Sequence, residues 1–194
     1  MSYDSIKALS DKIWYTRKSR IQASQRLLMV ESLSQIALYY YTLVILGLSI
    51  WSLTLHTGQY SSIPLITVIA SVVLFGLSIY IQSKKYGERA NALKECYIEL
   101  DALLLRVNAL QERRGSLFLV QQLDNLQKEY NHLILHVENH TQIDYLKSLL
   151  NARQKLRVLD WMRLILYYLF WVIVCLILFG VPLVLIFLVA KGVL

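Results

Sequence analysis

The sequence predicts an all-α membrane protein with a two-span transmembrane hairpin, a cytosolic antiparallel helical bundle and a third, C-terminal transmembrane helix. Residues 32–83 run for 52 positions without Asp, Glu, Lys or Arg, and residues 164–190 do so for 27 positions. About 20 consecutive apolar residues form a helix that crosses a hydrocarbon core of roughly 30 Å. The first window is therefore long enough for two crossings and the second for one. The charged, amphipathic segments lie outside these windows.

Residues 1–32 predict an N-terminal cytosolic amphipathic helix. The segment from Ser5 to Glu31 contains no Pro or Gly, and Ile6, Leu9 and Ile13 show a weak helical repeat. Residues 33–83 form the predicted hairpin, with spans at about 33–55 and 63–82. Gly58 and Pro64 mark the return between the spans.

Residues 84–163 predict the cytosolic helical region. Apolar side chains recur at three and four positions in two successive stretches, with a turn expected at Gly115. The stretches are Leu93, Tyr97, Leu100, Leu104, Val107 and Leu110, then Leu117, Val120, Leu123, Leu126, Tyr130, Leu133 and Val137. Two such helices joined by a short loop are expected to pair antiparallel.

A third cytosolic helix is predicted to begin at Thr141-x-x-Asp144, which resembles a capping box. Nothing in the sequence breaks this helix before Trp161, so it is expected to continue into the third span, residues 164–190. Gly180 and Pro182 predict a kink within that span.

The distribution of basic residues along the sequence predicts the orientation of the chain in the membrane. Six Lys/Arg lie in residues 1–31 and thirteen in residues 84–163, whereas residues 56–62 carry no formal charge. Short loops rich in Lys and Arg stay in the cytosol, so both basic segments are expected there, with the C-terminus on the opposite side. The same rule accounts for the net charge of +7 without a direct nucleic-acid partner.

The first two spans each carry a mildly polar stripe. Thr67, Ser71 and Ser78 fall on one face of the second span, with Gln82 just beyond. On the first span Gln35, Thr42 and Ser49 repeat every seven residues. Such residues either allow close helix packing or line a pore between several copies of the chain. The stripe residues are therefore pore-lining candidates: Thr67, Ser71, Ser78, Gln82, Thr42 and Ser49.

The sequence offers no catalytic residue, so an enzyme is not expected. Phosphate-binding loops, nucleophile elbows and paired-cysteine metal motifs are absent, and Cys96 and Cys175 are not expected to form a disulfide. His132, His136 and His140 are spaced four apart on the second predicted cytosolic helix. A solvated or packed histidine face explains them better than a metal site, because apolar residues fill the intervening positions. No cofactor or metal is predicted.

Several separated motifs resemble the SLATT family, two-span bacterial membrane effectors associated with nucleotide-sensing conflict systems. They are Ile13-Trp14-x-Thr16-Arg17 with Arg20, Ala23 and Arg26; Tyr86-x-x-Arg89-Ala90-x-x-Leu93-x-x-x-Tyr97; and Tyr130, Glu138-Asn139-His140 and Asp144-Tyr145. The resemblance covers roughly residues 5–150, so the third span makes the chain a variant.

The resemblance implies a pore-forming effector of the bacterial inner membrane that permeabilises the membrane and halts an infected cell. It implies a homo-oligomer in membrane lipid that responds to a sensor protein or a nucleotide second messenger. The residues expected to hold the resting packing or to sense the signal are Trp14, Arg20, Arg89, Tyr97, Asn139 and His140. The alternative function is a non-conducting membrane scaffold that recruits a partner through its cytosolic helices.

Overall fold

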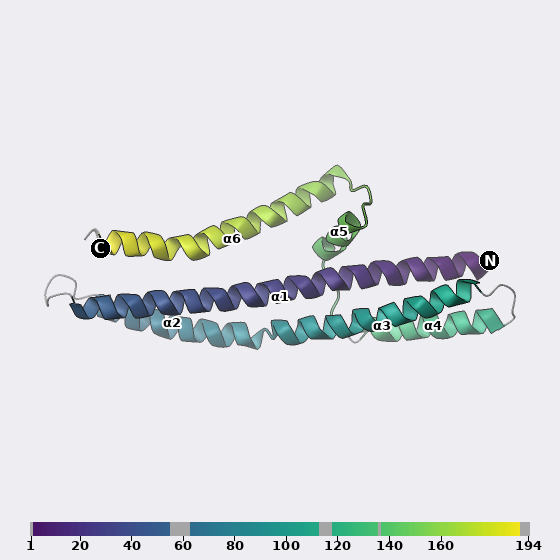
Figure 1. The fold of residues 1–194 in the computed structure, drawn as a ribbon, viewed down its shortest axis with the longest axis horizontal. Helices are drawn as coiled ribbons and strands as arrows, with labels where there is room; N and C mark the ends of the chain where they lie inside the picture. Colours follow the sequence, from purple (N-terminus) through teal and green to yellow (C-terminus); the bar gives the residue numbers. More distant parts are fainter. Residues whose placement is uncertain (1, 55–62, 113–117, 136, 191–194) are drawn as a thin grey trace. The chain divides into compact units, whose positions relative to one another are not determined.

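The computed structural model describes residues 2–54, 63–112, 118–135 and 137–190, and this part of the chain forms six helices and no strands (Figure 1). In chain order these are α1 (Ser2–Thr54), α2 (Ile63–Ser83), α3 (Tyr86–Glu112), α4 (Phe118–Leu135), α5 (Gln142–Asn151) and α6 (Val158–Ala190). The predicted all-α fold is confirmed. The expected turn at Gly115 and the return at Gly58 lie outside the described residues.

The chain divides into two compact units. Met1–Leu28 and Gly87–Ile165 form the first, here called the bundle unit. Met29–Tyr86 and Leu166–Leu194 form the second, the membrane unit. Helix α1 contributes to both units, so the predicted lead-in helix and first span are one uninterrupted helix.

The inner face of α1 follows a seven-residue repeat along most of its length. Ile6, Ile13, Arg20 and Leu27 are buried at this spacing, and Ser34, Tyr41 and Leu48 continue it. A second set fills the intermediate positions: Leu9, Thr16, Ala23, Val30, Ala37 and Val44. A strict seven-residue repeat keeps one face of a helix in contact when the helix takes part in a left-handed supercoil.

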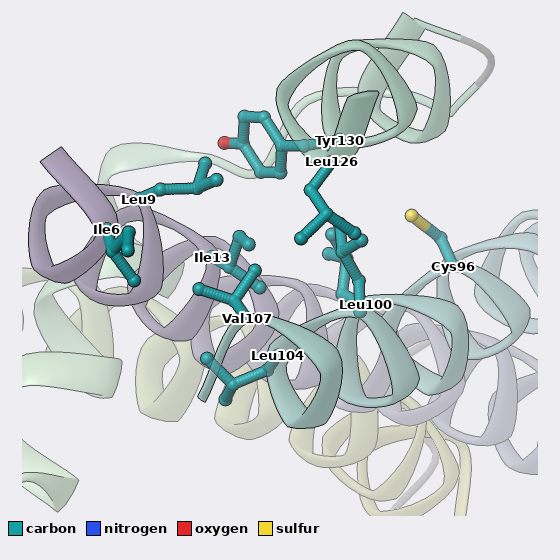
Figure 2. Packing of buried hydrophobic residues seen from close by; sticks show 10 residues of the cluster. Ile6, Leu9, Ile13, Cys96, Leu100, Leu104, Val107, Leu126 and Tyr130 are labelled. Atoms are coloured by element: carbon teal, nitrogen blue, oxygen red, sulfur yellow. The ribbon is translucent and has the colours of Figure 1, made fainter. Parts of the chain in front are cut away.

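The hydrophobic core of the bundle unit is built by α1, α3 and α4. Ile6, Leu9 and Ile13 of α1 belong to one cluster with Leu104 and Val107 of α3 (Figure 2). Leu126 and Tyr130 of α4 close the same cluster, which also contains Cys96, Leu100 and Leu103. The charged N-terminal segment is therefore held by apolar packing on one face.

Most of the predicted periodicity in this unit is confirmed. Leu93, Leu100 and Val107 on α3 are fully buried. Leu126 and Tyr130 on α4 are buried with at most 8% of their surface exposed. The prediction for Val120 was wrong, because this side chain is 68% exposed near the start of α4.

Helices α2 and α3 are separate. Lys84 forms a turn, and Lys85 adopts a left-handed backbone conformation with φ of 50°. A helix cannot propagate through a left-handed residue, so α2 ends at Ser83 and α3 begins at Tyr86.

The predicted capping box of α5 is confirmed. The Thr141 hydroxyl accepts from the backbone N–H of Asp144, and the Asp144 carboxylate accepts from the backbone N–H of Thr141 at 2.9 Å. The predicted continuation of this helix into the third span was wrong. Helix α5 ends at Asn151, Arg153 has φ of 54°, and α6 begins only at Val158. The intervening residues are mostly polar and lack a helical apolar stripe.

In the described part of the chain, three helices are long and apolar enough to cross a membrane, and they lie within residues 4–53, 64–110 and 158–184. Large apolar side chains cover the outside of the membrane unit, including Leu43, Phe75 and Leu176 at 67–68% exposure. Exposing apolar surface over whole helices is unfavourable in water but not in the hydrocarbon core of a membrane. The chain is a multi-pass membrane protein.

Candidate functional site

Arg20 is the largest fully buried side chain of the bundle unit. It lies on the inner face of α1 with 1% of its surface exposed. One guanidinium nitrogen donates to the Cys96 sulfur on α3, and the other donates to the Ile134 carbonyl on α4 at 3.3 Å. Its Nε has no hydrogen-bond partner among the described residues. Arg20 therefore ties three helices together while its charge is only partly compensated, which is costly in a buried position.

Cys96 is the sulfur partner of this arginine. Burial raises the pKa of the Cys96 thiol, and the nearby Arg20 guanidinium partly opposes that rise. A raised pKa keeps a thiol protonated and unreactive at neutral pH, so the contact is a packing and hydrogen-bonding contact.

A second buried charge joins α1 to α5. Arg26 forms a two-pronged pair with the Asp144 carboxylate, from Nε at 3.0 Å and from a terminal nitrogen at 3.1 Å. Asp144 is completely buried, and the same carboxylate completes the capping box of α5. Two-pronged pairs fix geometry as well as charge, so Asp144 sets the position of α5 against α1.

The contacts around this pair extend the α1–α5 connection. Ser19 and Ser148 share a hydrogen bond of 3.3 Å, and the Gln154 amide donates to the Tyr15 hydroxyl. Ser24 on α1 donates to the Ala90 carbonyl on α3 at 3.0 Å. One face of α1 therefore holds α3, α4 and α5 through polar contacts beside its apolar core.

His140 lies in the segment that leads into α5. Its Nδ1 is buried, and no described residue forms a hydrogen bond with it. Burial lowers the pKa of His140, the Arg20 charge lowers it further, and Asp144 opposes both. The ring is therefore held in its neutral form between an arginine and an aspartate.

The other predicted sensing residues have different surroundings. Arg89 pairs with Glu138 at 2.7 Å, which connects α3 to the segment before α5. Trp14 packs beside the core, edge-on to Tyr15, with the Lys18 ammonium over its ring. Tyr97 is half-buried, and Asn139 is exposed. The structure thus brings Arg20 and His140 into one neighbourhood and leaves Asn139 at the surface.

The predicted histidine face on one helix was wrong. Helix α4 ends at Leu135, so His132 is on the helix and is exposed, whereas His140 lies beyond it in non-helical chain. His136 lies outside the described residues. Among the residues that the structure describes, no group of three His, Cys, Asp or Glu residues could hold a metal ion.

In the membrane unit, the hydroxyls of the predicted polar stripes bond to their own helices. Thr67, Ser71 and Ser78 each donate to the carbonyl three residues earlier, at 2.7–2.9 Å. Thr42 and Ser49 donate to the carbonyl four residues earlier. Such bonds make a hydroxyl tolerable next to lipid and leave its oxygen able to accept a further bond.

A cavity of about 570 Å³ lies among α1, α2 and α6 within the membrane unit. Thr67 is buried and lines it, together with apolar residues of all three helices. Ser71, Ser78, Gln82, Thr42 and Ser49 do not line it. Of these, Ser71, Gln82 and Thr42 are exposed, and Ser78 and Ser49 are half-buried.

Two tyrosines of α1 donate to carbonyls of α6 near Pro182. Pro182 has no N–H, so the Leu178 carbonyl four residues earlier loses its helical donor. The Tyr41 hydroxyl donates to that carbonyl at 2.9 Å, and the Tyr40 hydroxyl donates to the adjacent Phe179 carbonyl at 3.2 Å. Tyr41 thus replaces the hydrogen bond that the proline removes.

Sequence reasoning missed the roles of Asp144 as a buried charge partner and of Tyr41 as a donor to α6. For Tyr41 a signal existed, because a proline inside a span always leaves a carbonyl four residues earlier in need of a donor. For Asp144 the capping pattern pointed to a local role only.

A family model described as SMODS and SLOG-associating 2TM effector domain family 5 matches residues 2–189. The matched region extends beyond residue 150 and includes nearly all of α6, so the third transmembrane helix lies inside it. No curated protein and no solved structure matches the chain.

Proposed function

This chain belongs to the SLATT family, whose members are membrane effectors of conflict systems, and we propose that it forms a pore as a homo-oligomer. The pore would permeabilise the bacterial inner membrane and stop growth of an infected cell. The trigger would be a sensor protein or a nucleotide second messenger that acts on the bundle unit.

The position of the polar stripe on α2 carries this proposal. The face of α2 that lines the cavity consists of Ile66, Thr67, Ala70, Val73, Leu74, Leu77 and Ile81. At 100° per residue, Ser71, Ser78 and Gln82 lie on average about 100° to one side of the centre of that face. The stripe is therefore available to a neighbouring copy or to water.

The polar stripe of α1 agrees with this placement. Thr42 and Ser49 lie about 100° from the centre of the cavity-lining face of α1, in the same rotational sense. Because α1 and α2 run in opposite directions, equal senses of rotation bring the two stripes to the same side of the hairpin (Figure 1). A ring of hairpins could direct that side toward a shared water-filled centre.

The polar contacts of the bundle unit support a resting role for this unit. Arg20, Arg26 and Asp144 fix α3, α4 and α5 on α1, so a ligand or sensor that separates these helices must break buried charge contacts. Such contacts give discrete states rather than gradual deformation, as a switch requires.

We place the N-terminus and the bundle unit in the cytosol, and the C-terminus across the membrane. The concentration of Lys and Arg in residues 1–31 and 84–163 supports this orientation. A fluorescent protein fused to the N-terminus should fluoresce, and alkaline phosphatase fused after residue 194 should be active. Inactive phosphatase at the C-terminus would refute the three-span orientation.

Membrane potential measured with a voltage-sensitive dye after induction in bacteria tests the pore. The Ser71→Leu/Ser78→Leu variant should lose depolarisation and growth arrest, because leucine closes the proposed polar lining. Val72→Leu/Ile79→Leu is the matched control, with the same spacing on a neighbouring exposed face of α2. It should depolarise as the unmodified chain does.

The outcomes separate the proposals. Depolarisation in both variants would keep the pore and reject this lining. An unchanged potential with the unmodified chain, also in the presence of the native trigger, would favour the non-conducting scaffold.

A further inference from the structure

Helix α3 has a second apolar stripe on the face opposite its core. Ile98 is 53% exposed and Leu105 is 66% exposed, and the exposed Ala102 and Ala109 lie between and after them. Their spacing of four, three and four places them on one narrow face of a helix. This set, Ile98, Ala102, Leu105 and Ala109, is called the outer seam below.

The outer seam is distinct from the buried face of α3. Leu93, Leu100 and Val107 point to the core of the bundle unit, about 180° around the helix from Ile98. A helix that needed only one apolar face would carry polar residues on the other. The pattern of large residues alternating with alanine is typical of a contact at which helices approach closely.

We propose that the outer seam is the surface through which the bundle units of neighbouring copies associate, with two α3 helices packed in parallel. The inference rests on the homo-oligomer of the proposed function and names a surface that joins its copies in pairs outside the membrane spans. The partner is a second copy of this chain.

The charges that flank the outer seam favour this partner. In a parallel coiled coil the residue at one edge faces the residue five positions later on the neighbouring helix. Lys94 then meets Glu99, and in the next repeat Asp101 meets Arg106. Both pairs have opposite charges, and each occurs twice in a symmetric pair of helices.

The antiparallel alignment of the same stripe is less complementary. It still pairs Glu99 with Arg106 but leaves Asp101 opposite the neutral Asn108. The charges therefore select the parallel arrangement, in which all copies are oriented alike as they are when inserted in one membrane.

Contacts within the chain already engage Asp101 and Arg106, so the Lys94–Glu99 pair is the main determinant of the parallel arrangement. Asp101 already pairs with Arg17 on α1 at 3.1 Å, and Arg106 pairs with Glu129 on α4. Those pairs fix the edges of the seam within the chain. Lys94 and Glu99 are both exposed, and no ion pair engages either within the described part of the chain.

Disulfide cross-linking of the full-length chain in native membranes tests the contact. Leu105→Cys should give a cross-linked dimer under mild oxidation, because the same residue of two parallel helices meets across the seam. Ala92→Cys is the matched control, since Ala92 is exposed on α3 about 80–140° away from the seam residues. The cross-linked fraction of this control should stay at the level of the unmodified chain, whose Cys96 is buried.

Charge substitutions test the same contact by its disruption. Ala102→Glu in the Leu105→Cys chain should lower the cross-linked fraction at least about tenfold, because it buries like charges between copies. Ala92→Glu should leave it unchanged. Lys94→Glu and Glu99→Lys should each lower the yield, and the two combined should restore it.

Restored cross-linking in the Lys94→Glu/Glu99→Lys chain excludes misfolding as the cause of the single losses. Equal cross-linking of Leu105→Cys and Ala92→Cys, or no effect of Ala102→Glu, would overturn the proposal. Depolarisation without seam cross-linking would leave the pore and reject the seam. Seam cross-linking without depolarisation would keep the seam and reject the pore.

Discussion

Individual buried charges organise the bundle unit at the residue scale. Arg20 donates from its two terminal nitrogens to a sulfur and a carbonyl and leaves its Nε without a partner among the described residues, whereas Arg26 pairs with a fully buried carboxylate. Removing one member of a buried pair leaves the other without compensation, which costs more than the pair itself contributes. These side chains therefore report directly on the packing of α1 against its neighbours.

Arg26→Ala should destabilise the bundle unit by about 3 kcal/mol, because Asp144 would stay buried without its cation. Thermal unfolding of the detergent-solubilised chain, followed by circular dichroism, would measure the loss. Lys128→Ala is the control, since Lys128 pairs with Asp124 on the exposed surface of α4. An unchanged unfolding temperature for Arg26→Ala would contradict the role given to Asp144.

His140 should make the stability of the bundle unit depend on pH. Burial and the Arg20 charge lower its pKa below the ordinary value of 6.5, so the folded state binds fewer protons than the unfolded state. The stabilisation is therefore present above that value and is lost as the pH falls below it. His140→Gln should flatten the difference in unfolding temperature between pH of about 7.5 and about 5.5.

The exposed His132 on α4 provides the control for this experiment. His132→Gln should keep the pH dependence of the unmodified chain. If His132→Gln lost the pH dependence and His140→Gln kept it, the effect would belong to His132 and the role given to His140 would be refuted.

At the scale of elements, α6 depends on a donor from another helix. Tyr41→Phe should cost about 1 kcal/mol, because the Leu178 carbonyl would lose its substitute hydrogen bond. In the Pro182→Ala background, residue 182 regains an N–H that can bond to the same carbonyl, so Tyr41→Phe should cost much less. A double-mutant cycle from unfolding in detergent measures the coupling. Additive effects would show that Tyr41 and Pro182 act independently.

The sequence predicted those elements whose apolar side chains recur regularly. The stripe on α3 and the capping box at Thr141 were both visible because they depend on residues at most four positions apart. The helix breaks at Lys85 and Arg153 were not visible, because both residues have positive φ without being glycine. The end of α4 at Leu135 likewise has no Gly or Pro nearby to mark it.

The candidate site was less predictable than the helices. The family motifs pointed to Arg20 and His140, which the structure brings near Asp144. The partner of Arg26 lies 118 positions away in the sequence, and periodicity carries no information about such a distance. Val120 was expected in the core because it fits the stripe, yet the stripe begins only after it.

At the scale of the whole molecule, α1 gives the two units a common element. The bundle unit takes residues 1–28 of this helix and the membrane unit takes the remainder. The family match covers both units, so the bundle and the spans belong to one effector domain.

The seven-residue repeat of α1 also constrains how related chains can vary in length. Within the bundle unit, one residue inserted between Ile13 and Arg20 would rotate every later side chain of α1 by about 100° around the axis, so Arg20 and Leu27 would leave the buried face. Seven inserted residues would return every later side chain to within about 20° of its original direction. Insertions and deletions in α1 are therefore expected in multiples of seven, whereas the breaks at Lys85 and Arg153 can absorb changes of any length.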